Sequence, residues 1–171
     1  DPSFCSNLKG MVVMGGSLRA GGNITPAAEA NFYHDPHAAD FVLRYGCNMT
    51  LVGLDVTNRV ICPRSFFARL ASESPKMGGL LHDMAEFYID FYETVGKFAG
   101  CGMHDPSALV ACIAPELFTT EPHALRVTLS GDRSGEMITV ANSTAQAVNV
   151  CTDVQAEAVK QNFFKNVAKL S

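Results

Sequence analysis

Short apolar runs alternate with amphipathic stretches along the first third of the chain, and their order predicts a βαβ unit. Two runs, residues 10–16 (GMVVMGG) and 48–56 (NMTLVGLDV), are predominantly apolar, which is typical of strands buried on both faces of a parallel sheet. Between them, Asp35 and Pro36 supply a helix N-cap and a proline at the first helical position, and Gly46 ends the helix. A strand, a helix and a strand at this spacing predict that the two strands are parallel.

The middle of the chain predicts a long helix at residues 77–98, preceded by a shorter one that begins at Pro63. The apolar positions of the long helix recur at helical spacing and predict one stripe that faces the core: Met77, Leu81, Met84, Tyr88, Phe91 and Val95. His82 lies on the opposite side of the helix. Its position predicts a surface histidine rather than a ligand.

The last third of the chain predicts an apolar helix that begins at Pro106, then a hairpin, a strand and a terminal helix. The hairpin strands are expected at residues 124–129 and 137–141, because GDRSG between them supplies turn residues. Residues 147–152 predict a third buried strand, and Asp153 predicts the cap of the last helix. Together these elements predict one α/β domain with a small antiparallel hairpin.

The composition supports a single domain over residues 1–171 and narrows the choice of partners. With 47% apolar and 18% charged residues, the chain can build one sizeable core and is not typical of a disordered protein. Lys and Arg number 13 against 17 for Asp and Glu, and the net charge of −4 argues against nucleic acid, because phosphate binding needs a basic surface. No apolar run is long enough to span a bilayer, so no association with a membrane is expected.

The six cysteines form no CxxC pair, and several lie within apolar runs. They predict buried free thiols in a reducing compartment, and therefore a cytoplasmic protein. Cys101 and His104 stand three residues apart, a spacing that zinc could use, but no second ligand pair follows. Because the chain begins at Asp1 rather than at a methionine, we expect it to start partway through a longer protein.

The glycine-rich stretch after the first predicted strand carries three polar side chains that could bind hydroxyl groups. They are Asn23, Glu29 and Asn31. Long loops that follow strands are usually functional. Amides donate and accept, and a carboxylate accepts from two hydroxyls, so the three side chains could bind a vicinal diol. They could also cap turns and the following helix, and the local pattern alone favours that alternative.

His104 and Asp105 form a second candidate pair, in the loop before Pro106. A histidine can donate a proton to a leaving group near neutral pH, and a carboxylate can bind a hard cation through oxygen. In the structural alternative, Asp105 caps the next helix and His104 fills the loop. The residues by themselves favour that alternative too.

Three stretches together resemble the nucleoside hydrolases, the N-ribohydrolases that cleave purine and pyrimidine ribosides. They are MGGSLRAGGNITPAAEANFYHDPHAADFVL, TLVGLDVTN and MHDPSALVACIAPELF. The fold implied by the resemblance is an open, mainly parallel, Rossmann-like sheet flanked by helices, with a calcium ion at the carboxyl ends of the strands. The activity implied is calcium-dependent hydrolysis of the N-glycosidic bond of uridine- or inosine-like ribonucleosides to ribose and free base. The expected assembly is a homodimer or homotetramer.

The resemblance implies that four residues of the glycine-rich stretch contact the ribose. Asn23 resembles the asparagine that binds the 5′-hydroxyl, and Glu29 resembles the glutamate that assists it. Asn31 is similar to the asparagine on the 2′-hydroxyl side of the sugar. Met14 matches a residue that lines the ribose pocket.

The second candidate pair also acquires roles from the resemblance. Asp105 resembles the calcium-ligating aspartate that contacts the 3′-hydroxyl as well, and His104 resembles the proton donor to the departing base. A histidine at this place suggests the branch that prefers uridine, or inosine and uridine.

Two departures from the family pattern change the expectation. Ala30 stands where many members have phenylalanine, which puts the substrate preference in question. The family's aspartate run of the form DxDxGxDD, which supplies most calcium ligands and the base that activates water, is absent. We therefore expect an N-terminal segment with this motif to be the missing partner of the chain, and the 171 residues alone to be inactive. The alternative is a non-catalytic ribose- or nucleoside-binding module, or an inactive truncated paralogue.

Overall fold

The two apolar runs predicted as parallel strands pair with each other in a four-stranded sheet. The computed structural model describes residues 4–95, 99–141 and 146–170. In it, β1 (Met11–Met14) and β2 (Met49–Val52) are parallel neighbours. β8 (Val148–Val154) lies parallel to β2 on its other side, and β5 (Phe118–His123) is antiparallel to β8, which gives the order β1-β2-β8-β5. The predicted α/β class with an open, mainly parallel sheet is confirmed.

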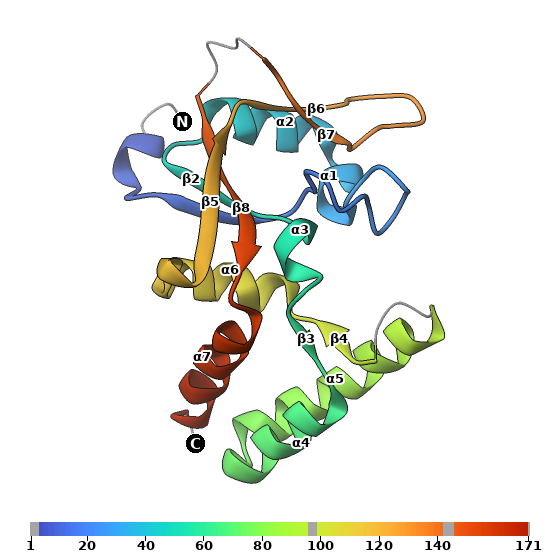
Figure 1. The fold of residues 1–171 in the computed structure, drawn as a ribbon, viewed down its shortest axis with the longest axis vertical. Coiled ribbons are helices and arrows are strands. Elements are labelled where there is room, and N and C mark those ends of the chain that lie inside the picture. The colour runs from blue at the N-terminus through green and yellow to red at the C-terminus, as the bar shows by residue number, and fades with distance from the viewer. Residues whose placement is uncertain (1–3, 96–98, 142–145, 171) are drawn as a thin grey trace.

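One face of the sheet is covered by the helices that connect β1 to β2 (Figure 1). They are α1 (Ala30–His34) and α2 (Pro36–Tyr45), and the predicted hairpin, β6 (Leu125–Val127) with β7 (Met137–Thr139), packs beside them. As expected, Asp35 caps α2 by accepting the Ala38 N–H at 2.9 Å. These elements bury a core that includes Phe32, Leu43, Met49, Leu51, Leu125 and Val150.

The other face of the sheet is covered by α6 (His104–Ile113), which contacts β1 and β2. The short helix α3 (Leu54–Thr57) follows β2 and contacts β8 and α6. Side chains from these elements form the largest buried cluster, with Val52, Val56, Val110 and Cys151 among its members.

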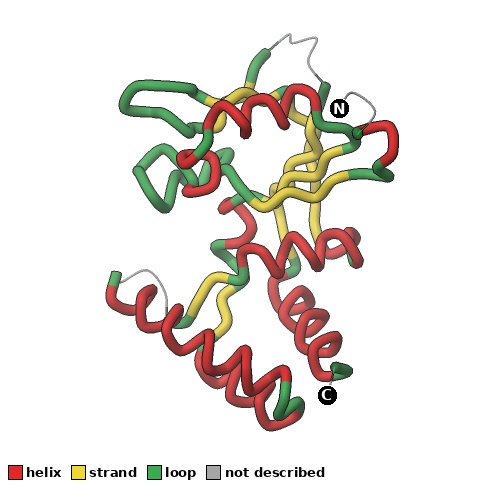
Figure 2. The backbone as a smooth tube through the Cα atoms, turned by 180° about the vertical axis from the view of Figure 1, so that it is seen from behind, coloured by secondary structure: helices red, strands yellow, loops and turns green. Residues whose placement is uncertain are grey.

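A second group of elements lies beyond a narrow antiparallel ribbon, as Figure 2 shows. The ribbon consists of β3 (Ile61–Cys62) and β4 (Cys101–Gly102), and it leads to the packed pair α4 (Arg64–Glu73) and α5 (Met77–Thr94). The last helix, α7 (Ala156–Ala168), contacts α4, α5 and α6. Two 3-10 turns, η1 (Cys5–Asn7) and η2 (Pro115–Leu117), complete the fold. None of the helices formed by the described residues combines the length and the apolar character that crossing a bilayer requires.

The stripe predicted to face the core on α5 is largely wrong. The buried residues of this helix are Gly78, Ala85, Ile89 and Tyr92, whereas Met84 and Phe91 are 63% and 54% exposed. Small residues explain the difference, because a Cβ on Gly78 would lie 2.2 Å from the Leu70 carbonyl oxygen and α4 packs directly against this glycine. The predicted end of the helix at residues 96–98 lies outside the described residues.

Three further sequence expectations need correction. The second strand ends at Val52 rather than at residue 56, because Gly53 is the N-cap of α3. Asp153 belongs to β8 and pairs with Arg59, while the N-cap of α7 is Gln155. Among the cysteines, Cys62, Cys101 and Cys151 are buried free thiols as expected, but Cys112 is exposed, and Cys5 and Cys47 are half-buried.

A buried carboxylate joins α2 to the hairpin. Asp40 is 4% exposed, and its Oδ1 accepts from Arg126 Nε at 2.6 Å and from the Val127 backbone N–H at 3.0 Å. Burial by itself would raise the pKa of Asp40, but these hydrogen bonds and the charge of Arg126 together lower it below its ordinary value. The ionised form is therefore the one that the folded state stabilises.

We expect Asp40→Asn to lower the free energy of unfolding at pH 7 by about 1–3 kcal/mol, the usual cost of disturbing a buried charged hydrogen bond. Because the pKa of Asp40 is lower in the folded state, its contribution is complete above the unfolded-state pKa and disappears as the pH falls through the folded-state value. The difference between wild type and variant should therefore shrink in acid. Urea denaturation at pH 7 and at successively lower pH measures it, with exposed Asp132→Asn as the control. A difference independent of pH would contradict the assignment.

Candidate functional site

The stretch after β1 is organised around the buried carboxylate of Glu29. This side chain is 2% exposed and caps α1. Its Oε2 accepts the Gly16 N–H at 2.9 Å and the Phe32 N–H at 3.1 Å, and its Oε1 accepts the Asn31 N–H at 2.9 Å. Gly16 has φ +67°, and a Cβ there would lie 2.9 Å from the Phe32 ring. Glu29 thus has the capping role that the local pattern favoured, and through Gly16 it holds the end of β1 against α1.

Asn23 and Asn31 flank this carboxylate and are both exposed. Asn23 Oδ1 accepts the Ala30 N–H at 2.9 Å, and Asn31 Nδ2 donates to the Met14 carbonyl oxygen at 3.4 Å. Direct contacts therefore join Met14, Glu29 and Asn31, and Asn23 binds the backbone of Ala30, which lies between Glu29 and Asn31. Since both amides are exposed, they can also bind polar groups of a ligand.

A residue that the sequence did not single out fixes the start of the same stretch. The carboxylate of Asp55, in the first turn of α3, accepts three backbone N–H groups: Leu18 at 2.6 Å, Arg19 at 2.7 Å and Ala20 at 3.0 Å. The sequence placed Asp55 inside a strand. The available signal was Gly53, which interrupts the apolar run and is the N-cap of the helix that contains Asp55.

His104 is the first residue of α6 and lies between two hydroxyl groups. Its Nε2 is 2.8 Å from Tyr92 Oη, and its Nδ1 is 2.8 Å from Thr57 Oγ1. Tyr92 Oη is in turn 3.2 Å from Tyr88 Oη. Burial, followed by the hydrogen bond with Tyr88, raises the pKa of Tyr92, so its phenol is neutral at physiological pH. His104 is only 9% exposed. Its ring contacts the Thr57 hydroxyl on one side and the Tyr92 hydroxyl on the other, and Tyr92 extends the network to Tyr88.

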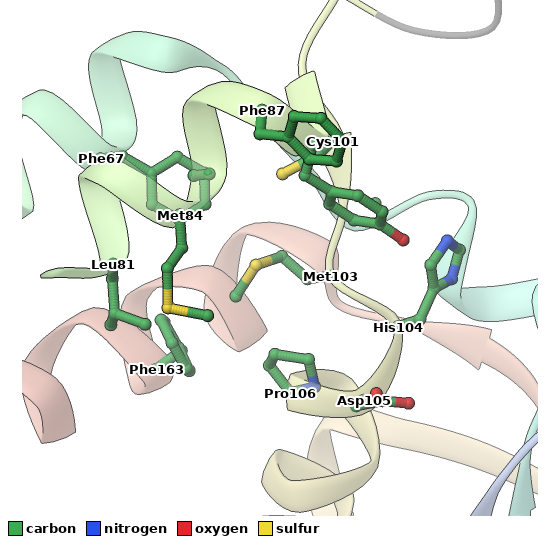
Figure 3. Close-up of a pocket in the computed structure, with 13 residues that line it drawn as sticks. Phe67, Leu81, Met84, Phe87, Cys101, Met103, His104, Asp105, Pro106 and Phe163 are labelled. Carbon is green, nitrogen blue, oxygen red and sulfur yellow. The ribbon is translucent and has the colours of Figure 1, made fainter. Parts of the chain in front are cut away.

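Asp105 follows His104 in the first turn of α6 and is exposed. Both residues line one side of a cavity of about 410 Å³ whose other walls are largely apolar and come from α4, α5, β4 and α7 (Figure 3). Among the described residues, no group of three or more His, Cys, Asp or Glu side chains is placed to hold a metal ion. Asp105 is therefore an isolated candidate ligand within this part of the chain.

A second cavity, of about 290 Å³, joins the Asn23 stretch to the hydroxyl network. Asn23 and Ala30 line it on one side, and Tyr88, Tyr92 and Phe91 of α5 line it on the other. Through Tyr92, which contacts His104, this cavity connects the imidazole to one predicted ribose-binding residue, Asn23. Of the six predicted residues, Asn23 alone is among the described residues that line this cavity, so the six do not share one enclosed space within the described chain.

Sequence reasoning did not find Thr57, Tyr88 or Tyr92 as site residues. Tyr88 was assigned to the apolar stripe of α5, and Thr57 lies 47 residues from the imidazole that it contacts. A pair of tyrosines at positions i and i+4 is common on helices and indicates no site by itself. The contact exists only because the ribbon β3–β4 brings α3, α5 and α6 together.

Comparison with known proteins gives a consistent result. The family model described as inosine-uridine preferring nucleoside hydrolase matches residues 1–161. The chain is 38% identical to a probable uridine nucleosidase 1 of Oryza sativa subsp. japonica over 138 residues, which cover 81% of this chain and 43% of that protein. It is 34% identical to a probable uridine nucleosidase 2 of Arabidopsis thaliana, over 93% of this chain and 52% of that protein.

Solved structures show the same relationship. A purine-preferring ribonucleoside hydrolase from Gardnerella vaginalis superposes with a TM-score of 0.91 at 32% identity, covering 99% of this chain and 55% of that one. A plant nucleoside hydrolase superposes with a TM-score of 0.92 at 27% identity, covering 98% of this chain and 56% of that one. The chain thus spans about half the length of the relatives that it matches.

Proposed function

Because the chain belongs to the inosine-uridine preferring nucleoside hydrolase family, we propose that it takes part in hydrolysing the N-glycosidic bond of a ribonucleoside to ribose and free base. A uridine- or inosine-like nucleoside is the proposed substrate. The observation that carries the proposal is the cavity in which the Asn23 stretch meets the Tyr92–His104 network. The Asn23 amide, which can bind hydroxyls, lies there beside the Tyr92 phenol, which can carry a proton, and cleavage of a glycosidic bond needs both functions.

In the proposed mechanism, the end of β1 and the start of α1 hold the sugar. Asn23 and Asn31 bind ribose hydroxyls with their amides, and Met14 contacts the ring. Glu29 positions these groups without contacting the sugar, because its two oxygens hold the backbone N–H groups of Gly16, Asn31 and Phe32. Asp55 fixes the preceding residues in the same way. The result is a sugar site whose geometry is set before the substrate binds.

His104 supplies the proton that the departing base needs. Both of its ring nitrogens face hydroxyl oxygens, which can accept hydrogen bonds, so the pocket accommodates the imidazolium that has a proton to give. Tyr92 lines the cavity, and we propose that it passes the proton on: its oxygen takes the Nε2 proton while its own proton goes to the base. The imidazole is left neutral and the phenol unchanged.

Calcium is the proposed cofactor, with Asp105 as one of its ligands. Calcium takes six to eight oxygen ligands, and the described residues contain no group of three or more candidate side chains around Asp105 or elsewhere. These described side chains therefore do not form a calcium site by themselves. The other ligands are proposed to come from a segment with an aspartate motif outside this chain.

A polypeptide of these 171 residues alone is expected to hydrolyse neither uridine nor inosine, whether calcium is present or not. The full-length protein with calcium is expected to hydrolyse both and to lose activity in a chelator. Release of reducing sugar measures the reaction. Hydrolysis by the 171-residue polypeptide would contradict the first expectation. Binding of nucleoside by the full-length protein without any release of ribose would instead indicate a non-catalytic nucleoside-binding module or an inactive paralogue.

We also propose that the protein is a cytoplasmic homodimer or homotetramer. The exposed apolar side chains of α5, which include Met84, Phe87 and Phe91, support burial of this face against other protein surface.

A further inference from the structure

The N-terminal turn η1 lies beside the connection from α2 to β2 (Figure 1). Cys5 is the first residue of η1, and Cys47 lies in the connection. Cys47 Sγ donates to the backbone carbonyl oxygen of Cys5 at 3.2 Å. Cys5 Sγ donates to the carbonyl oxygen of Tyr45 at 3.4 Å. Each thiol is thus hydrogen-bonded to a backbone carbonyl oxygen of the segment that contains the other cysteine.

Two further hydrogen bonds hold the two segments in this register. Asn48 Nδ2 donates to the Lys9 carbonyl oxygen at 2.8 Å, and the Met11 N–H donates to the Asn48 carbonyl oxygen at 3.1 Å. The parallel pairing of β1 with β2 begins immediately afterwards, with Met11 opposite Met49. The proximity of Cys5 and Cys47 is therefore fixed by the start of the sheet and does not depend on one side-chain contact.

The two thiols lie near each other, and both residues are partly exposed to solvent. The neighbouring Cys5 side chain raises the pKa of Cys47. Both residues are half-buried, so a small oxidant can approach either sulfur. The cysteines on the ribbon differ in this respect. Cys62 and Cys101 lie directly opposite each other on β3 and β4, but they are 0% and 3% exposed, and burial raises their pKa values to about 12 and about 11.

We propose that Cys5 and Cys47 are a disulfide-forming pair that a low-molecular-weight disulfide such as oxidised glutathione closes. A thiolate of the pair attacks one sulfur of oxidised glutathione, forming a mixed disulfide and releasing one glutathione. The second cysteine then attacks the mixed disulfide, forming the Cys5–Cys47 bond and releasing the second glutathione. The two protons lost by the cysteines go to the two glutathione thiols, so one disulfide is reduced as one is formed.

The bond would clamp the part of the fold that carries the candidate sugar site. It joins positions 42 residues apart, and β1, α1 and α2 lie between them together with Met14, Asn23, Glu29 and Asn31. Closing a loop of this length restricts the unfolded chain. We therefore expect the oxidised protein to melt about 4 °C or more above the reduced protein.

Peptide mapping after treatment with oxidised glutathione tests the proposal directly. Trypsin separates the relevant cysteines, because Cys5 lies in the peptide that ends at Lys9, whereas Cys47 lies alone in residues 45–59. Without reduction, these two peptides should appear as one species that lacks two hydrogen atoms relative to their sum. Cys62 and Cys101 should be recovered as alkylated thiols only when the protein is unfolded.

Two variants complete the test. Cys47→Ser should abolish both the linked peptide and the oxidant-dependent rise in melting temperature, whereas Cys112→Ser, at an exposed position on α6, should leave both unchanged. Recovery of Cys5 and Cys47 as free thiols, or as separate mixed disulfides with glutathione, would overturn the proposal. So would a linked pair that joins either cysteine to a different partner.

Discussion

Replacing His104 with alanine is expected to lower the turnover of uridine and inosine by the full-length enzyme by about 10²–10⁴-fold, the usual contribution of a general acid. Turnover of p-nitrophenyl riboside should fall far less, because its leaving group departs as a stable anion and needs no proton. The prediction follows from the position of the imidazole, which contacts the Tyr92 hydroxyl at the wall of the Asn23 cavity. Steady-state kinetics with both kinds of substrate measure the difference.

A second variant separates proton transfer from packing. Tyr92→Phe keeps the ring, which is 6% exposed, and removes only the hydroxyl that contacts Nε2. If the proton passes through Tyr92, this variant should also lose activity selectively on the natural nucleosides. Thr57→Val removes the partner of Nδ1, and it should affect the orientation of the imidazole without removing the path to the base. Equal losses on natural and activated substrates in His104→Ala would exclude His104 as the acid.

The elements that could be predicted are those that are indicated by residues close together in the sequence. The apolar runs of β1 and β2 indicate the type of each element and where it begins, although not the end of β2, and Asp35-Pro36 indicates the start of α2. Strand β5 was missed because its sequence, FTTEPH, contains a proline and does not alternate. It is an edge strand of the sheet, where a missing N–H is tolerated, so the sheet accepts a segment that no local pattern indicates.

Tertiary contacts account for the other errors. Helical periodicity shows which residues of α5 share a face, but not which face packs against the rest of the chain. The close approach of α4 at Gly78 turns the face with Ala85 and Ile89 inward. In the same way, Asp153 has the character of a helix cap, but it pairs with Arg59 from a distant part of the chain.

The candidate site was predictable only in part. Asn23, Glu29 and Asn31 could be identified as a group because they lie within nine residues of one another. The network around His104 could not, because Thr57 and Tyr92 reach the imidazole from two other elements. For Glu29, the capping and the functional interpretations are compatible. By capping α1, its carboxylate holds the backbone of the proposed sugar-binding stretch in place.

Among substitutions in this stretch, we expect Glu29→Gln to destabilise the fold the most. The change keeps the size of the side chain but replaces one acceptor oxygen with a donor NH₂ group. The carboxylate accepts from Gly16, Asn31 and Phe32 with both oxygens, so in either orientation the new NH₂ group faces at least one buried N–H. An unsatisfied buried donor costs about 1–3 kcal/mol.

The free energy of unfolding of the Glu29→Gln variant, measured in urea, should therefore fall by about 1–3 kcal/mol. The value of kcat/KM for uridine should fall as well, since Asn31 lies in the first turn of the helix that Glu29 caps. Glu157→Gln, an exposed acid in the first turn of α7, is the matched control and should change neither quantity. A stable Glu29→Gln variant with normal kinetics would show that the order of this stretch does not depend on the carboxylate.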